Sequence, residues 1–165
     1  MSPAPHEPIH ILMADDDADD RFLTKKALLK SRLANEVSFV EDGEELMDYL
    51  RYKGRYNKDN APRPDLILLD LNMPRKDGRE ALQEIKADPE LRSIPVVVMT
   101  TSQQEQDILH TYDIGVNSFI TKPVSFDELV KIMDVIGMYW FQIVKLPGLN
   151  TVHSHQETLQ ETVTV

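Results

Sequence analysis

Short strand-like runs rich in hydrophobic residues recur along the chain at residues 9–14, 66–69, 95–99 and 116–121. The run at 66–69 contains no polar position, which is typical of a strand buried on both faces of a parallel sheet. Pro74 cannot continue a central strand, so we expect this strand to end near Asp70. A shorter strand is expected at 37–40.

Hydrophobic residues at helical spacing fill most of the segments between these runs. The expected helices cover the acidic residues 17–20 to about 31, then 44–53, 79–87, 103–114, and the segment from the cap at Ser125 to about 145. Ser125 and Glu128 have the spacing of a capping box. Strands that alternate with helices five times predict an α/β fold with a parallel sheet and right-handed crossovers.

Polar side chains follow these runs at their carboxyl ends. The first run ends in Asp15-Asp16-Asp17, and the others end at Asp70, Thr100-Thr101 and Lys122-Pro123. In open α/β sheets, ligands and chemistry are found at this end of the strands. Asp70 alone could be a simple cap, but acids, hydroxyls and a lysine together suit a divalent cation and a phosphoryl group.

Length and composition narrow the classes of protein that remain. A chain of 165 residues is expected to form one domain, with a flexible lead-in at 1–8, the domain at 9–146 and a polar tail at 147–165. The net charge of -10 disfavours a nucleic-acid surface. The absence of cysteine excludes disulfides and fits a cytoplasmic protein. Neither a signal peptide nor a run of about 20 apolar residues is apparent, so no membrane association is expected.

The ordered set Asp15, Asp16, Asp70, Thr100 and Lys122-Pro123 resembles a response-regulator receiver domain of a two-component system. The resemblance extends over about 9–144. The stretches 96–102 and 107–113 and the insertion 51–64 are similar to a narrower group, the single-domain regulators paired with bacterial and cyanobacterial phytochrome histidine kinases. The resemblance to receiver domains implies a three-layer (βα)5 flavodoxin-like sandwich with the strand order 2-1-3-4-5 and, here, an extended C-terminal helix.

A carboxylate can attack a phosphoryl group to form an acyl phosphate, and this role is assigned to Asp70. Clustered carboxylates at Asp15, Asp16 and Asp70 repel one another unless a cation neutralises them, and oxygen ligands of this kind suit Mg²⁺. The resemblance implies that Asp16 is the main direct ligand, that Asp15 acts partly through water, and that the backbone carbonyl of Asn72 completes the set. Asp17 is interpreted as a helix N-cap, and the alternative is that it is a further metal ligand.

The resemblance also gives roles to the ends of the last two strands. Lys122 can pair with Asp70 before the reaction and with the phosphoryl oxygen afterwards. Thr100 can donate its hydroxyl to the phosphoryl group and, in receivers, is coupled to an aromatic residue at the position of Phe119. Phe119 has no hydroxyl, so its rotamer would be sensed by packing alone. The switch is expected to alter the face formed by the fourth helix, fifth strand and fifth helix.

Three other functions compete with this interpretation. A phosphotransferase of the haloacid-dehalogenase type needs a second aspartate two residues after the nucleophile, where this chain has Asn72. A dinucleotide-binding domain needs Gly-x-Gly after the first strand, where this chain has Asp15-Asp16. A phosphorylation-independent scaffold does not require the five core residues, all of which are present. We therefore expect a signalling protein that accepts a phosphoryl group from a histidine kinase and is not an enzyme.

The last helix carries two hydrophobic stripes, one more than a single sheet can cover. The first is expected to pack on the sheet and consists of Leu129, Ile132, Met133, Ile136, Trp140 and Ile143. The second consists of Val135, Met138, Tyr139, Gln142 and Leu146. It predicts a twofold homodimer that pairs this helix, together with the fourth helix and the fifth strand, with the same face of a second copy. The interface residues expected on this helix are Val135, Met138, Tyr139, Trp140, Phe141 and Gln142. The alternative is that residues 149–165 fold back over this stripe.

Overall fold

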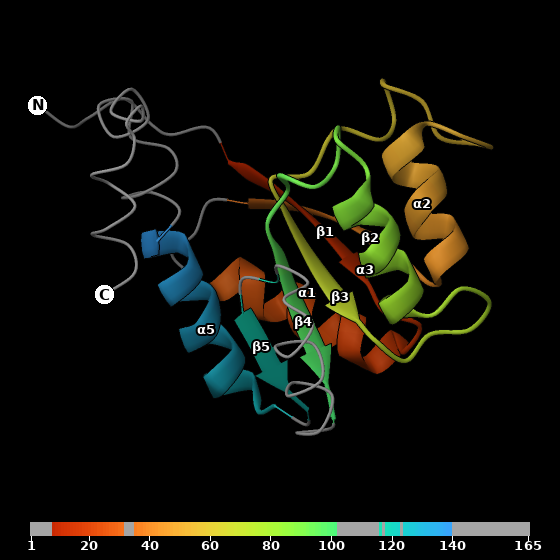
Figure 1. Ribbon diagram of the computed structural model, residues 1–165. Coiled ribbons are helices and arrows are strands. Elements are labelled where there is room, and N and C mark those ends of the chain that lie inside the picture. The colour runs from red at the N-terminus through yellow and green to blue at the C-terminus, as the bar shows by residue number, and fades with distance from the viewer. Residues whose placement is uncertain (1–7, 32–34, 102–115, 117, 123, 140–165) are drawn as a thin grey trace, which may run out of the picture.

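The computed structural model describes residues 8–31, 35–101, 116, 118–122 and 124–139. Its five strands are β1 Ile9–Ala14, β2 Asn35–Val40, β3 Leu66–Asp70, β4 Val96–Thr100 and β5 Ser118–Thr121. Its helices are α1 Ala18–Lys30, α2 Gly43–Arg51, α3 Gly78–Ala87 and α5 Phe126–Tyr139. The strands pair in parallel in the order β2-β1-β3-β4-β5, which confirms the expected topology (Figure 1).

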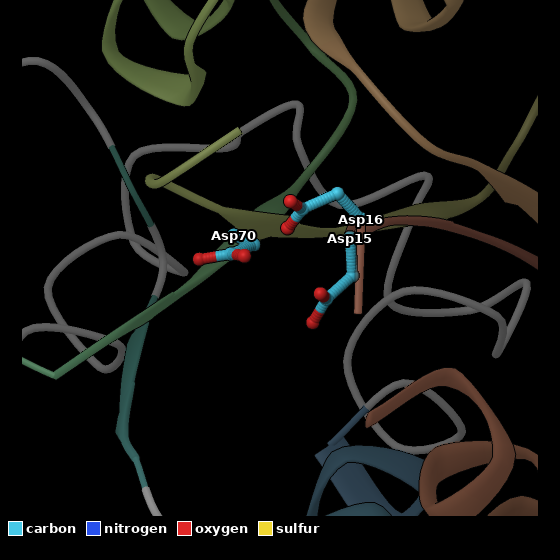
Figure 2. A group of neighbouring side chains, drawn as sticks. All are labelled: Asp15, Asp16 and Asp70. Atoms are coloured by element: carbon cyan, nitrogen blue, oxygen red, sulfur yellow. The ribbon is translucent and has the colours of Figure 1, made fainter. Parts of the chain in front are cut away.

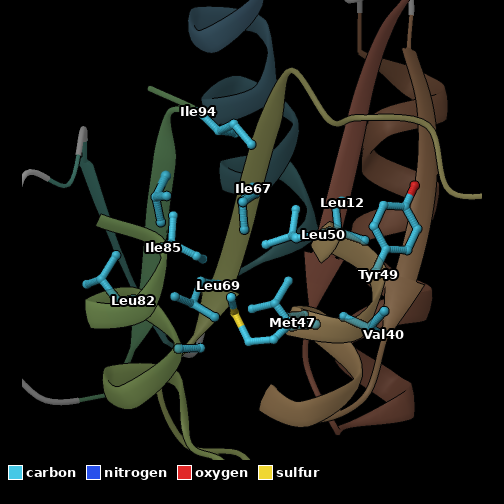
Figure 3. Packing of buried hydrophobic residues seen from close by; sticks show 14 of the residues in the cluster. Leu12, Val40, Met47, Tyr49, Leu50, Ile67, Leu69, Leu82, Ile85 and Ile94 are labelled. Carbon is cyan, nitrogen blue, oxygen red and sulfur yellow. The ribbon is translucent and has the colours of Figure 1, made fainter. Parts of the chain in front are cut away.

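Helices cover both faces of this sheet, so the molecule has three layers (Figure 1). On one face, Leu12, Ile67 and Leu69 pack against α2 and α3 (Figure 3). On the other face, Met13 and Leu68 pack against α1 and α5. Every residue of β3 is buried, as its uninterrupted hydrophobic pattern predicts. The expected α/β sandwich is confirmed, and β3 occupies its centre.

Side-chain caps explain where the helices begin. Asp17 is the N-cap of α1 and accepts hydrogen bonds from two backbone N–H groups of the first turn, which confirms its expected role. Asp77 and Glu80 form a capping box at α3 that the sequence interpretation missed. Ser125 and Glu128 form the expected one, with each side chain bonded to the other residue's N–H at 3.1 Å.

Several boundaries differ from expectation for local reasons. β2 begins at Asn35, two residues early, because its pairing with β1 starts at Ile9. β4 begins at Val96, after a turn in which the Ile94 N–H bonds the Leu91 carbonyl at 3.0 Å. α2 ends at Arg51 because the next residue adopts the left-handed conformation, with φ 58°. The helix expected at 103–114 and the continuation of the last helix beyond 139 lie outside the described residues.

The insertion before β3 is bonded to α2. The Tyr49 hydroxyl donates to the Pro62 carbonyl at 3.0 Å, and the Tyr56 hydroxyl donates to Glu45 at 2.5 Å. The rings of Tyr49 and Tyr56 lie 5.2 Å apart, centroid to centroid. These contacts order the loop between α2 and the central strand. Among the described residues, no helix has the length and apolarity to cross a membrane.

Candidate functional site

Backbone pairing carries the candidate residues to one edge of the sheet. The N–H of Asp15 bonds the Val40 carbonyl at 3.0 Å, which extends the β1–β2 pairing by one residue. The N–H of Lys122 bonds the Thr100 carbonyl at 2.9 Å and does the same for β4 and β5. Asp70 is the last residue of β3. The parallel sheet therefore holds side chains from four strand ends at one edge, as the sequence predicts.

Three carboxylates converge at this edge, as Figure 2 shows. Asp15, Asp16 and Asp70 each offer a ligand atom, and these atoms all lie within 4.8 Å of one another. Asp15 and Asp70 are buried, whereas Asp16 is exposed. Three oxygen ligands at this separation, one of them open to solvent, fit a hard divalent cation that keeps some of its waters.

The two buried acids have the same local geometry. Oδ1 of Asp15 accepts the N–H of Asp17 at 2.9 Å, and Oδ1 of Asp70 accepts the N–H of Asn72 at 3.1 Å. Each carboxylate is thus oriented by the turn that follows its strand. The Oδ2 atoms of both acids face Lys122.

Lys122 lies among three acids rather than on Asp70 alone. Its Nζ is 2.7 Å from Oδ2 of Asp20, 3.0 Å from Oδ2 of Asp15 and 3.4 Å from Oδ2 of Asp70. The sequence interpretation paired Lys122 with Asp70 and placed Asp20 only among the acidic residues at the start of a helix, where negative charge is favoured. The contact with Asp20 was missed because the two residues are 102 positions apart.

Burial dominates the electrostatics of the two buried acids. It raises the pKa of Asp15 from its ordinary value of 3.8 to about 6, against the opposing effects of the Asp17 N–H and the Lys122 charge. Burial also raises the pKa of Asp70, again opposed by a backbone N–H and by Lys122. Burial by itself would lower the pKa of Lys122, but the hydrogen bond to Asp20 and the charges of Asp15 and Asp70 outweigh it and raise that pKa. A cation bound to these acids would oppose the effect of burial, because a nearby positive charge lowers the pKa of a carboxyl group.

We expect this burial to make stability fall as the pH rises in Mg²⁺-free buffer. The folded chain keeps the Asp15 proton up to about pH 6, whereas the unfolded chain loses it near pH 3.8. The stabilisation is full below pH 3.8 and is lost as the pH rises through about 6. Relative to Asp15→Asn, wild type should lose about 3 kcal/mol of unfolding free energy over that interval, measured by urea denaturation at each pH.

The matched control is Asp19→Asn, which removes the same charge from an exposed position on α1. Its unfolding free energy should run parallel to that of wild type across the pH range. Parallel curves for wild type and Asp15→Asn would show that Asp15 ionises with an ordinary pKa.

Gly78 sets the distance between α3 and the end of β3. A Cβ atom at this position would lie 2.3 Å from the carbonyl oxygen of Asp70, and the Gly78 N–H bonds the Leu71 carbonyl at 2.9 Å. Only glycine allows this approach without movement of the Asp70 backbone. This contact was not predicted, although the Asp77-Gly78 pair before a helix was the available signal.

The described residues among those predicted to form the switch and the dimer interface lie on β4, β5 and α5. Thr100 ends β4 and is completely buried, whereas its neighbour Thr101 is exposed. Phe119 is half-buried and packs against the core on the α2 and α3 side. On α5, Val135 and Met138 are exposed by 63% and 62%. The side chain of Tyr139 and the whole of Trp140, Phe141 and Gln142 lie outside what the structure describes.

Residues 11–134 match the family described as response regulator receiver domain. The chain belongs to that family. This receiver domain has the flavodoxin-like fold expected of it, and the general mechanism of the family is phosphorylation of an aspartate.

Individual relatives show which receiver domains are similar to this chain. Response regulator Rcp1 of Synechocystis sp. is 42% identical over 148 residues, which are 90% of this chain and 99% of Rcp1. The crystal structure of the phosphorylated cyanobacterial phytochrome response regulator RcpA is 48% identical, with a TM-score of 0.73, and the match covers 86% of this chain and 99% of RcpA. The Mn²⁺-bound form of Rcp1 has a TM-score of 0.71 at 43% identity, and the match covers 85% of this chain and 99% of Rcp1. The expected resemblance to phytochrome response regulators is thereby confirmed.

Proposed function

We propose that this receiver domain accepts a phosphoryl group on Asp70 from a histidine kinase of the phytochrome type. The observation that carries the proposal is the position of Asp70. It is a buried carboxylate at the end of the central strand, within 4.8 Å of two further acids and 3.4 Å from Lys122 Nζ. The kinase class is supported by the similarity to phytochrome response regulators. A kinase partner of this class supports the further proposal of a cytoplasmic location.

The reaction balances without a further reactant. A carboxylate oxygen of Asp70 attacks the phosphorus of a phosphohistidine, the P–N bond breaks as the P–O bond forms, and the imidazole leaves with a proton from solvent. Asp15, Asp16, Asp70 and the backbone carbonyl of Asn72 would hold Mg²⁺. When bound, Mg²⁺ neutralises charge on the phosphoryl oxygens. Lys122, whose Nζ lies 3.4 Å from Oδ2 of Asp70, supplies a second positive charge.

Phosphorylation then changes the charge at the site. The acyl phosphate carries about -1.5 to -2 charges, in place of the single negative charge of the Asp70 carboxylate. Thr100 donates its hydroxyl to a phosphoryl oxygen, and the space that it leaves allows Phe119 to turn inward. Phe119 is half-buried and packs against the core, so an inward turn would bury more of its ring. The result is a population shift between two packings of the same fold, read by other proteins at the β5 and α5 surface.

Mass spectrometry after incubation with acetyl phosphate and Mg²⁺ tests this function. We expect one phosphoryl group per chain and no continued release of product beyond slow hydrolysis of the acyl phosphate. Repeated rapid turnover of the donor would favour the phosphotransferase alternative, in which the protein is an enzyme. A chain that takes up no phosphate from acetyl phosphate or from a phytochrome kinase would support the scaffold alternative.

The exposed stripe of α5 supports a further proposal, that the protein forms a twofold homodimer. Leu129 and Met133 are buried against the core, as the first stripe predicts, whereas Val135 and Met138 remain exposed. The proposed interface joins these two residues with the aromatic residues 139–141 and Gln142. Aromatic anchors of this kind dominate interface energies.

Val135→Asp should convert the dimer into a folded monomer, because a buried, unpaired carboxylate is costly at an interface. Sedimentation velocity at micromolar concentrations measures the change. Phe22→Asp is the matched control, since Phe22 on α1 is exposed by 64%, close to the 63% of Val135. The control should remain dimeric. A wild-type protein that is monomeric at all concentrations would refute the dimer and favour residues 149–165 as the cover.

A further inference from the structure

Asp20 makes the shortest contact to the lysine of the site. The distance from Lys122 Nζ to Asp20 Oδ2 is 2.7 Å, compared with 3.4 Å to Asp70. Asp20 lies in the first turn of α1, and its side chain is 35% exposed, whereas that of Lys122 is only 15% exposed. Asp20 is not one of the three acids whose ligand atoms converge.

The contact matters because two cations must share one set of carboxylates. Lys122 faces Oδ2 of both Asp15 and Asp70. These acids also belong to the group that fits a divalent cation. A largely buried ammonium group needs a charged partner. Without another acid nearby, Lys122 would therefore compete with the metal for those oxygens.

We propose that Asp20 is the positioning residue of Lys122: it holds the ammonium group while the cation occupies Asp15, Asp16 and Asp70, and releases it to the phosphoryl oxygens when Asp70 is phosphorylated. The release step rests on the proposed function, because it assigns the phosphoryl group to Asp70. The holding step depends only on the contacts of Lys122. Asp20 lies outside the group of acids that fits the cation, so it acts through the lysine.

The geometry makes the transfer short. Lys122 already lies 3.4 Å from Asp70 Oδ2 while it is bonded to Asp20, so a small side-chain movement suffices. A phosphoryl group carries more charge than the carboxylate of Asp20, which favours the transfer. Asp20 is also the most exposed of the three acids that contact Lys122, at 35% against 0% for Asp15 and 5% for Asp70. Water can therefore take the place of the departing lysine more readily at Asp20 than at the other two acids.

The test is the affinity of the full chain for Mg²⁺, measured by titration calorimetry. In Asp20→Asn, Lys122 should turn fully onto Asp15 and Asp70 and compete with the metal, which raises the Kd for Mg²⁺ roughly fivefold, the size of a partly exposed charge pair. Asp20→Glu keeps the carboxylate and should restore most of the affinity. Asp19→Asn removes an exposed charge from the same turn of α1 and should change the Kd less than about twofold.

A double-mutant cycle separates an effect through Lys122 from a direct effect of charge. In the Lys122→Gln background, Asp20→Asn should have no larger effect on the Kd than Asp19→Asn. An undiminished effect in that background would overturn the proposal, as would equal Kd values for Asp20→Asn and Asp19→Asn in the wild-type background. Asp20→Ser serves as a second neutral variant, and thermal unfolding confirms that each variant is folded.

Failure of this inference can be distinguished from failure of the proposed function. If wild type is phosphorylated by acetyl phosphate but its Mg²⁺ affinity does not depend on Asp20, only the role of Asp20 is refuted. If wild type takes up no phosphate, the proposed function is refuted and the release step with it. The holding step would then be decided by the Mg²⁺ titrations alone.

Discussion

Asp70→Asn should take up no phosphoryl group from acetyl phosphate or from a kinase, whereas wild type takes up one per chain. An amide is a far weaker nucleophile than a carboxylate and cannot form the acyl phosphate. The expected effect is complete loss of the mass increase in intact-protein mass spectrometry. It is the largest effect expected of any single substitution in the site.

The variant should fold, which makes the result specific. Oδ1 of Asp70 accepts the Asn72 N–H, and the amide oxygen of an asparagine can accept the same bond. The substitution also removes one charge from a group of three converging acids, so thermal stability without Mg²⁺ should not fall. Asp19→Asn is the control and should be phosphorylated like wild type. Full labelling of Asp70→Asn would show that another carboxylate is the acceptor.

Much of the site could be predicted because its signals are local. The hydrophobic run at 66–69 ends at Asp70, and a parallel sheet places such ends at one edge. The structure has β3 end at Asp70 with every residue buried. The order of the strands was implied by the resemblance to receivers and not by the pattern itself, because hydrophobic alternation does not say which strands are neighbours.

Contacts between distant residues could not be predicted in the same way. Asp20 already had a sufficient explanation as an acid in the first turn of a helix, so nothing in the pattern pointed to Lys122. The structure adds this partner because α1 begins beside the end of β5 at the same edge. Gly78 is a similar case, since its need for glycine arises from the Asp70 carbonyl oxygen 2.3 Å from its absent Cβ. Both are products of the tertiary arrangement.

The exposed stripe of α5 is an intermediate case. Helical periodicity correctly separated buried Leu129 and Met133 from exposed Val135 and Met138. It indicates that a hydrophobic surface exists, whereas the partner of that surface depends on a second molecule or on residues 149–165. The dimer therefore stays a prediction until the oligomeric state is measured.

Asp16→Ala should abolish the stabilisation that Mg²⁺ gives the folded chain. A ligand that binds only the folded state raises the unfolding free energy by about 2.7 kcal/mol at a concentration 100 times its Kd. For a chain of this size the midpoint of thermal unfolding should rise by roughly 5–10 °C. Asp16 is the exposed member of the three acids. Its loss leaves two buried carboxylates that already face Lys122, so we expect little or no Mg²⁺-dependent shift.

Without Mg²⁺ the same substitution should be neutral or stabilising. The charge of Asp16 raises the pKa of Asp70, which shows that the two acids repel one another, and alanine removes that repulsion. Opposite effects with and without Mg²⁺ separate a metal ligand from a residue that merely supports the fold. Asp19→Ala, at an exposed position of α1, should keep the full Mg²⁺-dependent shift. An undiminished shift in Asp16→Ala would show that the cation binds elsewhere and that Asp16 is not a metal ligand.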